Sequence, residues 1–581
     1  MRRRDIIRLA IAPSPLFQSL KWAMIAVCGG AMLALPVSAQ LNGLSNPAII
    51  DRALNEPETI NARGPAPIIL PEATAAPDGS DDVFFTVQTI TIRGNQLFSL
   101  AEITDLSLPP SGTEIAVADI YALSEAITQH YRTEGYALSF AFVPAQEIAS
   151  GNVLIEVIEG QITELRIRET NLSDLARRHI LDAFERFAQK GTTRTDDLEE
   201  FLLLVNDYPG ITAQGIITAG NTKNSSAMVL EVQQRIQSAS IGYQNYLSES
   251  LGRDVFLADL ALLGQWTGRD EARLSLRQAP DPLTYRSVRF DYSTYVDDTD
   301  LEIFIRTTES ATKPEKGPLH DLSFTSSAYS QTVGMRYPIW KRRSDKLTVG
   351  GHLSVSDSSS LNGDTISTND KTRAVTAYAD YEIDLASGAS HFLHIELEQG
   401  AKFFHARANS RANANLHHSV LRLSDRYRQP LFIDSNKQID ATLRLFAQVT
   451  LSDDPLYSNA ECGFGGRGFG VGMDAGTLSG EDCLLASLQI NYQRPFTHFE
   501  FLPPSILTLL GRIDAGSVRQ KGLLTPGQER QQEAITAAIG AQFAMEGGLT
   551  IQLERATQVK NEEEPKKEGE DMTNISVNLS F

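Results

Sequence analysis

The last nine residues, Thr573 to Phe581, read T-N-I-S-V-N-L-S-F. Apolar side chains stand at every second position, at Ile575, Val577, Leu579 and Phe581, with polar side chains between them. Such alternation describes a β-strand with one apolar and one polar face, because successive side chains of a strand point to opposite sides. A core strand of a soluble sandwich has the same pattern. Its recurrence along roughly the last 340 residues favours a bacterial outer-membrane barrel.

Residues 236–581 divide into alternating segments separated by turn-forming residues, and we count sixteen of them. They are 238–247, 254–264, 270–278, 285–295, 300–308, 324–338, 346–356, 374–385, 392–402, 415–425, 440–451, 484–494, 505–515, 533–545, 548–556 and 573–581. An even number suits a single-chain bacterial barrel, and most segments have the roughly 9 to 11 residues that cross a bilayer. Connections after odd-numbered segments are the longer ones, for example 357–373 and 452–483, which places the amino end of the barrel in the periplasm.

Residues 1–39 have the parts of a secretory signal peptide: a basic start, an apolar stretch and the small residues Val37-Ser38-Ala39 before the cleavage site. The alternative, a membrane anchor, needs about 20 apolar residues, and Trp22 to Leu35 is shorter. Residues 40–82 follow as a separate segment. Asn46 and Pro47 suit the start of a short amphipathic helix over residues 46–56, and five prolines then predict an extended linker.

Residues 83–160 and 161–235 predict two similar α+β modules in front of the barrel. Each contains a strand, helical sequence and two further strands, so that helices cover one face of a small sheet. A sheet of this kind leaves open edges, and open edges accept extended peptides by strand addition. We therefore expect the sheet edges of the two modules to bind a client polypeptide.

Composition and motifs disfavour several functions. The net charge of -20 offers no basic stripe for nucleic acid. The sequence has no metalloprotease, hydrolase or phosphate-loop motif, so we expect no enzymatic activity, no cofactor and no metal site. His405, His417 and His418 fall near a predicted external loop, where we expect them to be solvated.

A glycine-rich stretch, E-C-G-F-G-G-R-G-F-G at residues 461–470, lies between the eleventh and twelfth segments. Its glycine spacing matches a dinucleotide fingerprint, but that motif requires a helix after it, and here an alternating strand follows. Glycines on both sides of Arg467 instead predict a compact hairpin that holds one guanidinium in a narrow space, where a carboxylate is the natural partner.

Cys462 and Cys483 enclose this stretch with 20 residues between them. Two cysteines of an exported chain in an oxidising compartment are a disulfide candidate. Two separate free thiols are the alternative. A pair of cysteines alone does not form a structural zinc site.

Several motifs together resemble the two-partner secretion transporters, the TpsB family within the superfamily of POTRA-bearing outer-membrane barrels. Arg467-Gly468-Phe469 is similar to the family's V-R-G-[FY] loop motif, although Gly466 stands where valine is usual. Residues 478–482 are similar to the run that follows this motif, and residues 512–516 to the family's x-D-x-G strand motif. The first POTRA signature matches at residues 123–136 and at Leu138, Pro144, Gly151 and Gly160.

The resemblance implies a specific architecture. Residues 83–160 and 161–235 would be two periplasmic POTRA domains, residues 236–581 a sixteen-strand barrel, and loop 452–483 would fold into its lumen. The helix near residue 46 would plug the pore. The family aspartate pairs with the motif arginine, here Asp514 with Arg467, and Gly516 completes the strand motif.

The alternation of the thirteenth segment supports the same pair. Asp514 faces the lumen if Leu509 and Ile513 face lipid, and a carboxylate enclosed in a barrel needs a cation. Two unrelated solvated charges are the alternative. We predict that Arg467 and Asp514 form a latch between loop and wall.

The resemblance also implies a function. We expect a monomeric outer-membrane pore that recognises one large exported β-helical partner, an adhesin or haemolysin-like protein, in unfolded form through its POTRA domains. An insertase that assembles other barrels and a passive porin are the alternatives. The sequence does not name the partner.

Overall fold

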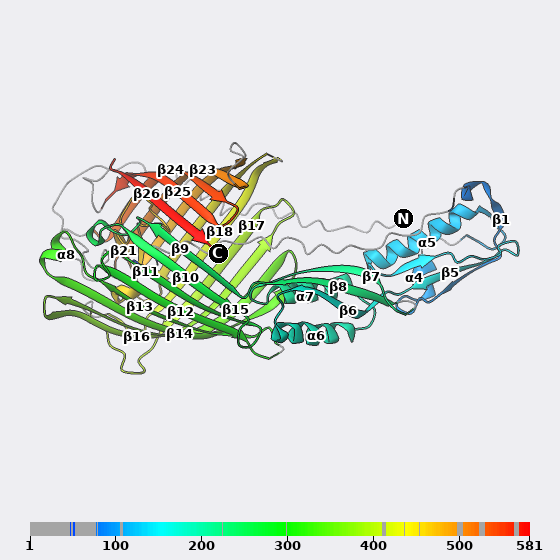
Figure 1. Ribbon diagram of the computed structural model, residues 1–581, viewed down its shortest axis with the longest axis horizontal. Helices are drawn as coiled ribbons and strands as arrows, with labels where there is room; N and C mark the ends of the chain where they lie inside the picture. The colour runs from blue at the N-terminus through cyan, green and yellow to red at the C-terminus, as the bar shows by residue number, and fades with distance from the viewer. Residues whose placement is uncertain are drawn as a thin grey trace. The chain divides into compact units, whose positions relative to one another are not determined.

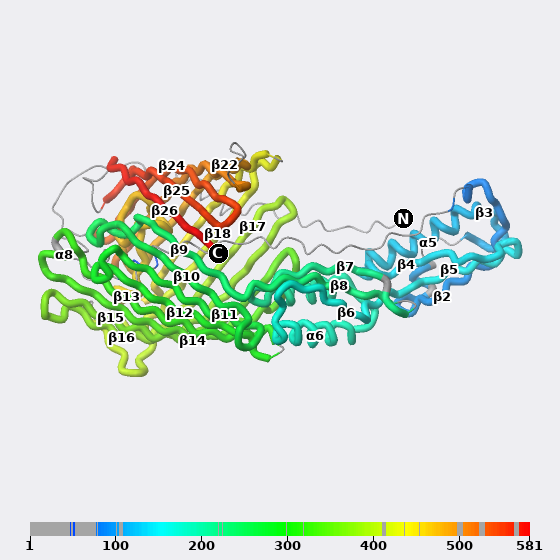
Figure 2. The backbone as a smooth tube through the Cα atoms, viewed as in Figure 1, coloured from blue at the N-terminus to red at the C-terminus, as the bar shows by residue number. Residues whose placement is uncertain are grey.

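A computed structural model describes residues 47, 50, 52, 77, 79–104, 109–222, 225–297, 299–409, 414–434, 436–452, 454–496, 503–521, 529–562 and 569–581. The predicted signal peptide, residues 1–39, lies outside the described residues, as does most of the predicted linker. Figures 1 and 2 show a cylinder of strands coloured green to red and two small α+β modules coloured blue to cyan. No helix among the described residues is long and apolar enough to cross a membrane.

The first module comprises η1 (Ser80–Asp82), β1 (Phe84–Thr86), β2 (Thr89–Arg93), α4 (Leu100–Thr104), β3 (Glu114–Ala116), α5 (Val117–Thr133), β4 (Phe140–Phe142) and β5 (Asn152–Ile158). Its main sheet has the order β2-β5-β4, and β1 pairs with β3. Helix α5 buries Ile127 and Tyr131 against alternate residues of β5, such as Ile155. Burial raises the pKa of Tyr131 above its ordinary value, and its hydroxyl donates to Glu159 Oε1 at 2.9 Å.

The second module repeats this plan with β6 (Gln161–Thr170), α6 (Asp174–Ala188), α7 (Thr195–Asn206), β7 (Ile211–Ala219) and β8 (Ser225–Gln234). Ser173 caps α6 by accepting a hydrogen bond from the N–H of Ala176 at 3.3 Å. Phe184, Phe187 and Phe201 pack together between the two helices and the sheet. The sheet order β6-β8-β7 leaves β6 and β7 as edges. In both modules the last strand in sequence, β5 or β8, lies at the centre of the sheet, and the two earlier strands form its edges.

Sixteen antiparallel strands form a closed barrel, which confirms the predicted fold class. They are β9 (Gln237–Gln244), β10 (Val255–Leu263), β11 (Asp270–Gln278), β12 (Tyr285–Tyr295), β13 (Glu302–Thr312), β14 (Phe324–Lys341), β15 (Asp345–Asn362), β16 (Thr365–Asp384), β17 (Ser390–Gly400), β18 (Ser419–Asp434), β19 (Lys437–Thr450), β22 (Asp482–Phe496), β23 (Ser505–Arg519), β24 (Gln531–Met545), β25 (Leu549–Asn561) and β26 (Asp571–Ser580). Strand β26 closes the barrel on β9 through five residue pairs, from Ser576 with Gln244 to Ser580 with Ser240. Every other neighbouring pair in the barrel has at least eight.

The final strand has the predicted faces. Asn574 is fully buried inside the barrel, whereas Ile575 and Phe581 are exposed on its outside. Leu353, Leu397, Leu509 and other large apolar residues are likewise exposed along the outer surface. An apolar exterior around a polar interior is the pattern of a barrel in lipid.

Two predicted connections are much shorter in the structure than expected. Residues 357–373 were expected to be a loop, but β15 and β16 continue through them as a long hairpin that turns at residues 363–364. The sequence there is serine-rich and lacks an apolar face, so alternation does not reveal the strands. Strands β18 and β19 also extend until Asp434 pairs with Lys437, where a longer connection was expected.

Candidate functional site: an inward loop and a polar lumen

The connection between β19 and β22 contains a hairpin that contacts the inner wall of the barrel. Its two short strands are β20 (Cys462–Phe464) and β21 (Leu478–Gly480), and η3 (Ser458–Ala460) precedes them. The structure joins Cys462 and Cys483 in a disulfide. Gly465 has a φ of 120°, and a Cβ there would lie 2.1 Å from the carbonyl oxygen of Asp474, so the tight turn requires glycine.

Asp514 lies on the inner face of β23 and is fully buried. Its Oδ2 accepts hydrogen bonds from the loop N–H groups of Gly470 and Val471 at 3.0 and 3.1 Å. Its Oδ1 accepts from Arg512 Nε at 2.7 Å. The carboxylate therefore fixes the loop through backbone groups and shares its charge with a neighbour on the same strand.

Arg512 also belongs to this site, although the sequence analysis gave it no role. Besides its ion pair with Asp514, it donates to the loop carbonyls of Arg467 and Gly468. The signal was available, because residues two apart on a strand share a face and an inward Asp514 implies an inward Arg512. One guanidinium thus joins the wall carboxylate and the loop backbone.

The side chain of Arg467 makes contacts other than the predicted one. It donates to Oε1 of Gln244, the last residue of β9, at 2.8 Å. Its guanidinium carbon lies 5.3 Å from the ring centroid of Tyr246, which follows that strand. The contacts that the structure gives Asp514 are with Arg512, Gly470 and Val471. The ion pair that the structure gives Asp514 is therefore with Arg512, on the same strand, and not with Arg467. That Arg467 and Asp514 form a latch between loop and wall stays a prediction.

The other predicted residues of the motif pack around this contact. Phe469 lies under the guanidinium of Arg444, 5.4 Å from ring centroid to Cζ, and its carbonyl accepts from the N–H of Gly465. Phe464 is fully buried against Gly516, where a Cβ would lie 2.3 Å from its ring. Gly516 is thus needed for the loop to approach the wall.

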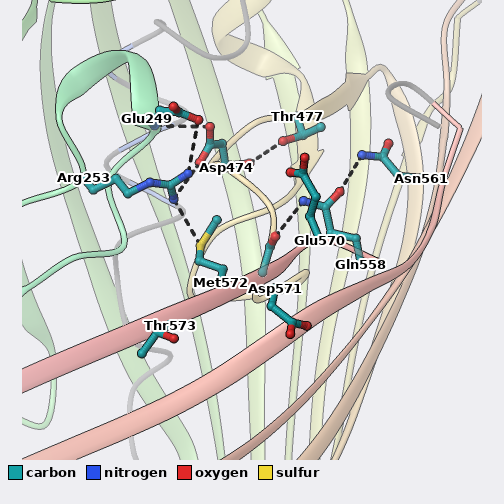
Figure 3. Close-up of a pocket in the computed structure, with 11 residues that line it drawn as sticks. Glu249, Arg253, Asp474, Thr477, Gln558, Asn561, Glu570, Asp571, Met572 and Thr573 are labelled. Carbon is teal, nitrogen blue, oxygen red and sulfur yellow. Dashed lines mark hydrogen bonds and ion pairs between the residues drawn. The ribbon is translucent and has the colours of Figure 1, made fainter. Parts of the chain in front are cut away.

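The loop also contacts the connection between β9 and β10 on one side and strand β25 on the other, as Figure 3 shows. On one side, Arg253 and the N–H of Glu249 bind Asp474 at 3.3 and 3.2 Å, and Arg253 also reaches the sulfur of Met572. On the other side, Gln558 of β25 donates to the carbonyl of Gly472 at 2.9 Å.

The predicted N-terminal helix is described at three positions, Pro47, Ile50 and Arg52, and all three are helical. Ile50 is fully buried in an apolar cluster inside the barrel that includes Tyr246 of the wall region and Val471 of the loop. Arg52 Nη2 donates to the carbonyl of Asn459 at 2.9 Å. These contacts place the described part of the helix in the lumen.

A cavity of about 500 Å³ lies in the lumen beside Arg52 and is lined by hydroxyl-bearing side chains together with charged and histidine side chains. The serine and threonine residues of its lining are Thr308, Ser310, Ser330, Thr332, Ser354, Ser356, Thr372 and Ser424. Arg422 in the same wall pairs with Glu396 and Glu398 at 2.6 and 3.0 Å. Within the described residues no cluster of side chains could hold a metal ion.

One of the three histidines expected to be solvated is not. His405 and His417 are exposed, but His418 is fully buried and its Nε2 lies 2.8 Å from Glu398 Oε1. It directly precedes β18 and lies four residues before the inward Arg422, so the lumen rather than the exterior surrounds it. The expectation for His418 was wrong because it rested on proximity to a loop and not on strand parity.

Comparisons with known proteins agree with this architecture. The family described as haemolysin secretion/activation protein ShlB/FhaC/HecB matches residues 224–543, more than half of the chain. The chain belongs to this family. The POTRA domain of ShlB type matches residues 85–160. Family and fold place the protein in the bacterial outer membrane, with its POTRA region on the periplasmic side.

Individual relatives are distant. The chain is 26% identical over 213 residues to the heme/hemopexin transporter protein HuxB of Haemophilus influenzae, covering 35% of this chain and 36% of that protein. It is 24% identical over 188 residues to the outer membrane transporter CdiB of Escherichia coli, covering 32% and 31%. The matched part thus spans about a third of the length of these curated relatives.

Solved structures support the fold over nearly the whole chain. CdiB from Escherichia coli aligns with a TM-score of 0.65 at 16% identity, covering 93% of this chain and 95% of that one. CdiB from Acinetobacter baumannii aligns with a TM-score of 0.58, also at 16% identity, covering 91% and 95%. The second module, residues 161–235, has the strand order of the first, which supports its prediction as a POTRA domain.

We predict that the Asp514→Ala variant releases the loop. The change removes the acceptor of two loop N–H groups and leaves Arg512, which is 6% exposed, without its carboxylate, a loss of roughly 3 to 5 kcal/mol for an enclosed pair. Trypsin cleavage after Arg467 in the folded, detergent-solubilised protein should accelerate about tenfold or more. Asp440→Ala is the control, because Asp440 is equally buried and pairs with Arg428 away from the loop. Equal cleavage rates in wild type and Asp514→Ala would contradict the assignment.

The disulfide gives a second prediction. Neither Cys462 nor Cys483 should take up an alkylating reagent in the folded protein until reductant is added, as mass spectrometry of tryptic peptides can show. Closing a loop of this length contributes roughly 3 kcal/mol in the chain-entropy model. The Cys462→Ser/Cys483→Ser variant should therefore show faster trypsin cleavage of the loop. Alkylation of either thiol without reductant would exclude the bridge.

Proposed function

We propose that the protein exports a large partner protein, in extended form, across the outer membrane through its own barrel. The lumen carries the proposal. A cavity lined by hydroxyl groups and by charges that pair with one another offers an unfolded chain a wet path. The helix and loop that reduce the opening are held by contacts that water can replace. The names of two relatives, a heme/hemopexin transporter protein and an outer membrane transporter, are consistent with transport.

The described modules support client capture by strand addition. Edge strand β6 carries the charged side chains Glu164, Arg166 and Arg168, which disfavour pairing with another chain. Edge strand β7 carries none. The side chain of Asn206 binds both backbone groups of Ala213, so alternation turns the backbone groups of Gly215 and Ile217 to the same open edge. We infer that an uncharged extended client segment pairs with β7 from Gly215 onward.

The partner that best fits such a path is a large secreted β-helical protein of the adhesin or haemolysin class, as the family resemblance implies. No ATP is present at the outer membrane, so progressive folding outside the cell would draw the chain outward. An insertase for other barrels is the second candidate, because open POTRA edges suit unfolded barrel proteins equally well. The described helix in the lumen favours secretion, since a plugged pore is a device for controlled passage.

Deletion of the encoding gene should abolish secretion of one large partner protein and leave the amounts of other outer-membrane proteins unchanged, as quantitative proteomics of the medium and of outer-membrane fractions can measure.

When expressed in the deletion strain, the Arg467→Ala and Asp514→Ala variants should each reach the outer membrane but should not restore full secretion, because the loop loses its contacts with the wall. Full secretion by both variants would count against the latch. A general loss of outer-membrane proteins after deletion would assign the insertase function instead.

The plug can be tested without a client. Ile50→Asp places a carboxylate in the apolar cluster of Tyr246 and Val471, at a cost of several kcal/mol, and should displace the helix. Planar-bilayer conductance of this variant, and of a deletion of residues 41–60, should exceed that of the wild type. Ile50→Val keeps the apolar contact and serves as the control. Unchanged conductance in the deletion variant would show that the helix does not close the pore.

A further inference from the structure

A strained turn follows β17 on the external side of the barrel. The N–H of Ala406 donates to the carbonyl of Phe403 at 3.2 Å, and the two central residues, Phe404 and His405, have φ values of 48° and 58°. Residues with side chains adopt this conformation at a free-energy cost. Phe404 is 73% exposed, the largest value among the large apolar side chains of the described residues. A strained turn that exposes an aromatic ring suggests a binding role.

The turn lies on the outer side of the barrel wall. Val375 of β16 is 45% exposed on the outer surface, and residues two apart on a strand share a face, so Arg373 also points outward. Arg373 is only 6% exposed because it donates to Asp357 Oδ1 at 2.7 Å and to the carbonyl of Phe404 at 3.3 Å. The turn therefore covers Arg373 from outside, just beyond the end of the apolar band.

Arg407 joins the same surface. Its backbone pairs with that of Lys371 through hydrogen bonds of 2.6 and 2.8 Å, and directly opposed residues of two strands share a face. Its guanidinium donates to the side-chain oxygen of Asn369 at 2.8 Å, a neutral partner. Lys402 and His405 are exposed on the turn itself.

We call this surface the rim patch and define it by Lys371, Arg373, Lys402, Phe404, His405 and Arg407. It holds four permanently cationic side chains. Among the described residues, Asp357 is the carboxylate that pairs with this patch: it contacts Lys371 at 3.2 Å and also pairs with Arg373. The local excess of positive charge contrasts with a net charge of -20 for the whole chain.

We propose that the rim patch binds the phosphate-bearing headgroup of a glycolipid in the outer leaflet. Lysine and arginine form charge-assisted hydrogen bonds with phosphate, and basic clusters at a membrane surface select anionic headgroups. An exposed aromatic ring beside them suits the boundary between acyl chains and headgroups. The patch faces away from the lumen, so this inference goes beyond the proposed export function and does not depend on it.

The test uses the full-length protein in detergent, titrated with bisphosphorylated lipid A, with its dephosphorylated form and with phosphatidylglycerol, and native mass spectrometry measures the bound lipid. Lys402→Gln/Arg407→Gln should weaken lipid A binding by about tenfold or more, because each cation near an anionic headgroup contributes about 1 kcal/mol. Phe404→Ser should weaken it less. Lys437→Gln is the control, since Lys437 is a cation beside a phenyl ring, 5.0 Å from the centroid of Phe432, but at the periplasmic end of the barrel.

Wild-type protein should bind lipid A more tightly than either other lipid, and Lys437→Gln should bind it like the wild type. Equal affinity for the dephosphorylated lipid or for phosphatidylglycerol would overturn the assignment, as would an equal loss in the control variant. Gel mobility before and after heating shows whether each variant is folded. If the double variant does not fold, the comparison of lipids on the wild type and the Phe404→Ser variant decides.

Discussion

Lipid offers no hydrogen bonds to a polypeptide backbone, so each strand that crosses the membrane must pair on both sides. In this barrel the first and last strands, β9 and β26, pair with each other through five residue pairs and so close the cylinder. Closure separates two environments along every strand. Alternate side chains face lipid and are apolar, as Leu353 and Leu509 are, while those between them face an enclosed interior that accepts charge.

The interior then imposes its own constraint, because an enclosed carboxylate is stable only when donors surround it. Asp514 meets this condition with one arginine and two backbone N–H groups, and the N–H groups belong to the loop. The buried charge therefore fixes the loop in the lumen. The wall elsewhere uses the same chemistry, with Arg422 between Glu396 and Glu398, but there the partners are all on strands, and the space beside them stays open.

Sequence alone predicted the fold because membrane strands carry a strong periodic signal. All sixteen strands and the α+β modules were found, and errors arose where the signal disappears, as at the serine-rich end of the β15–β16 hairpin, which has no apolar face. The site was less accessible. Motif resemblance selected Arg467 and Asp514. Which inward cation pairs with a buried carboxylate depends on three-dimensional geometry, and here Arg512, on the same strand as Asp514, makes the ion pair. Strand parity, applied to Arg512 and His418, would have placed both side chains on the inner face of the barrel.

The position of the loop relative to the closing strands links these observations. Its Arg467 contacts Gln244 at the end of β9, and its Asp474 binds Arg253 just before β10. Its Gly472 carbonyl is bound by Gln558 of β25, the strand next to β26. The loop thus bridges both sides of the barrel's shortest strand pairing. The loop contacts are made to polar groups that water can also hydrogen-bond, so moving the loop exchanges hydrogen bonds rather than losing them. The five residue pairs between β9 and β26 have no such replacement, because lipid offers no hydrogen bonds. The physical chemistry therefore favours a transporter that rearranges its lumen while its wall stays closed.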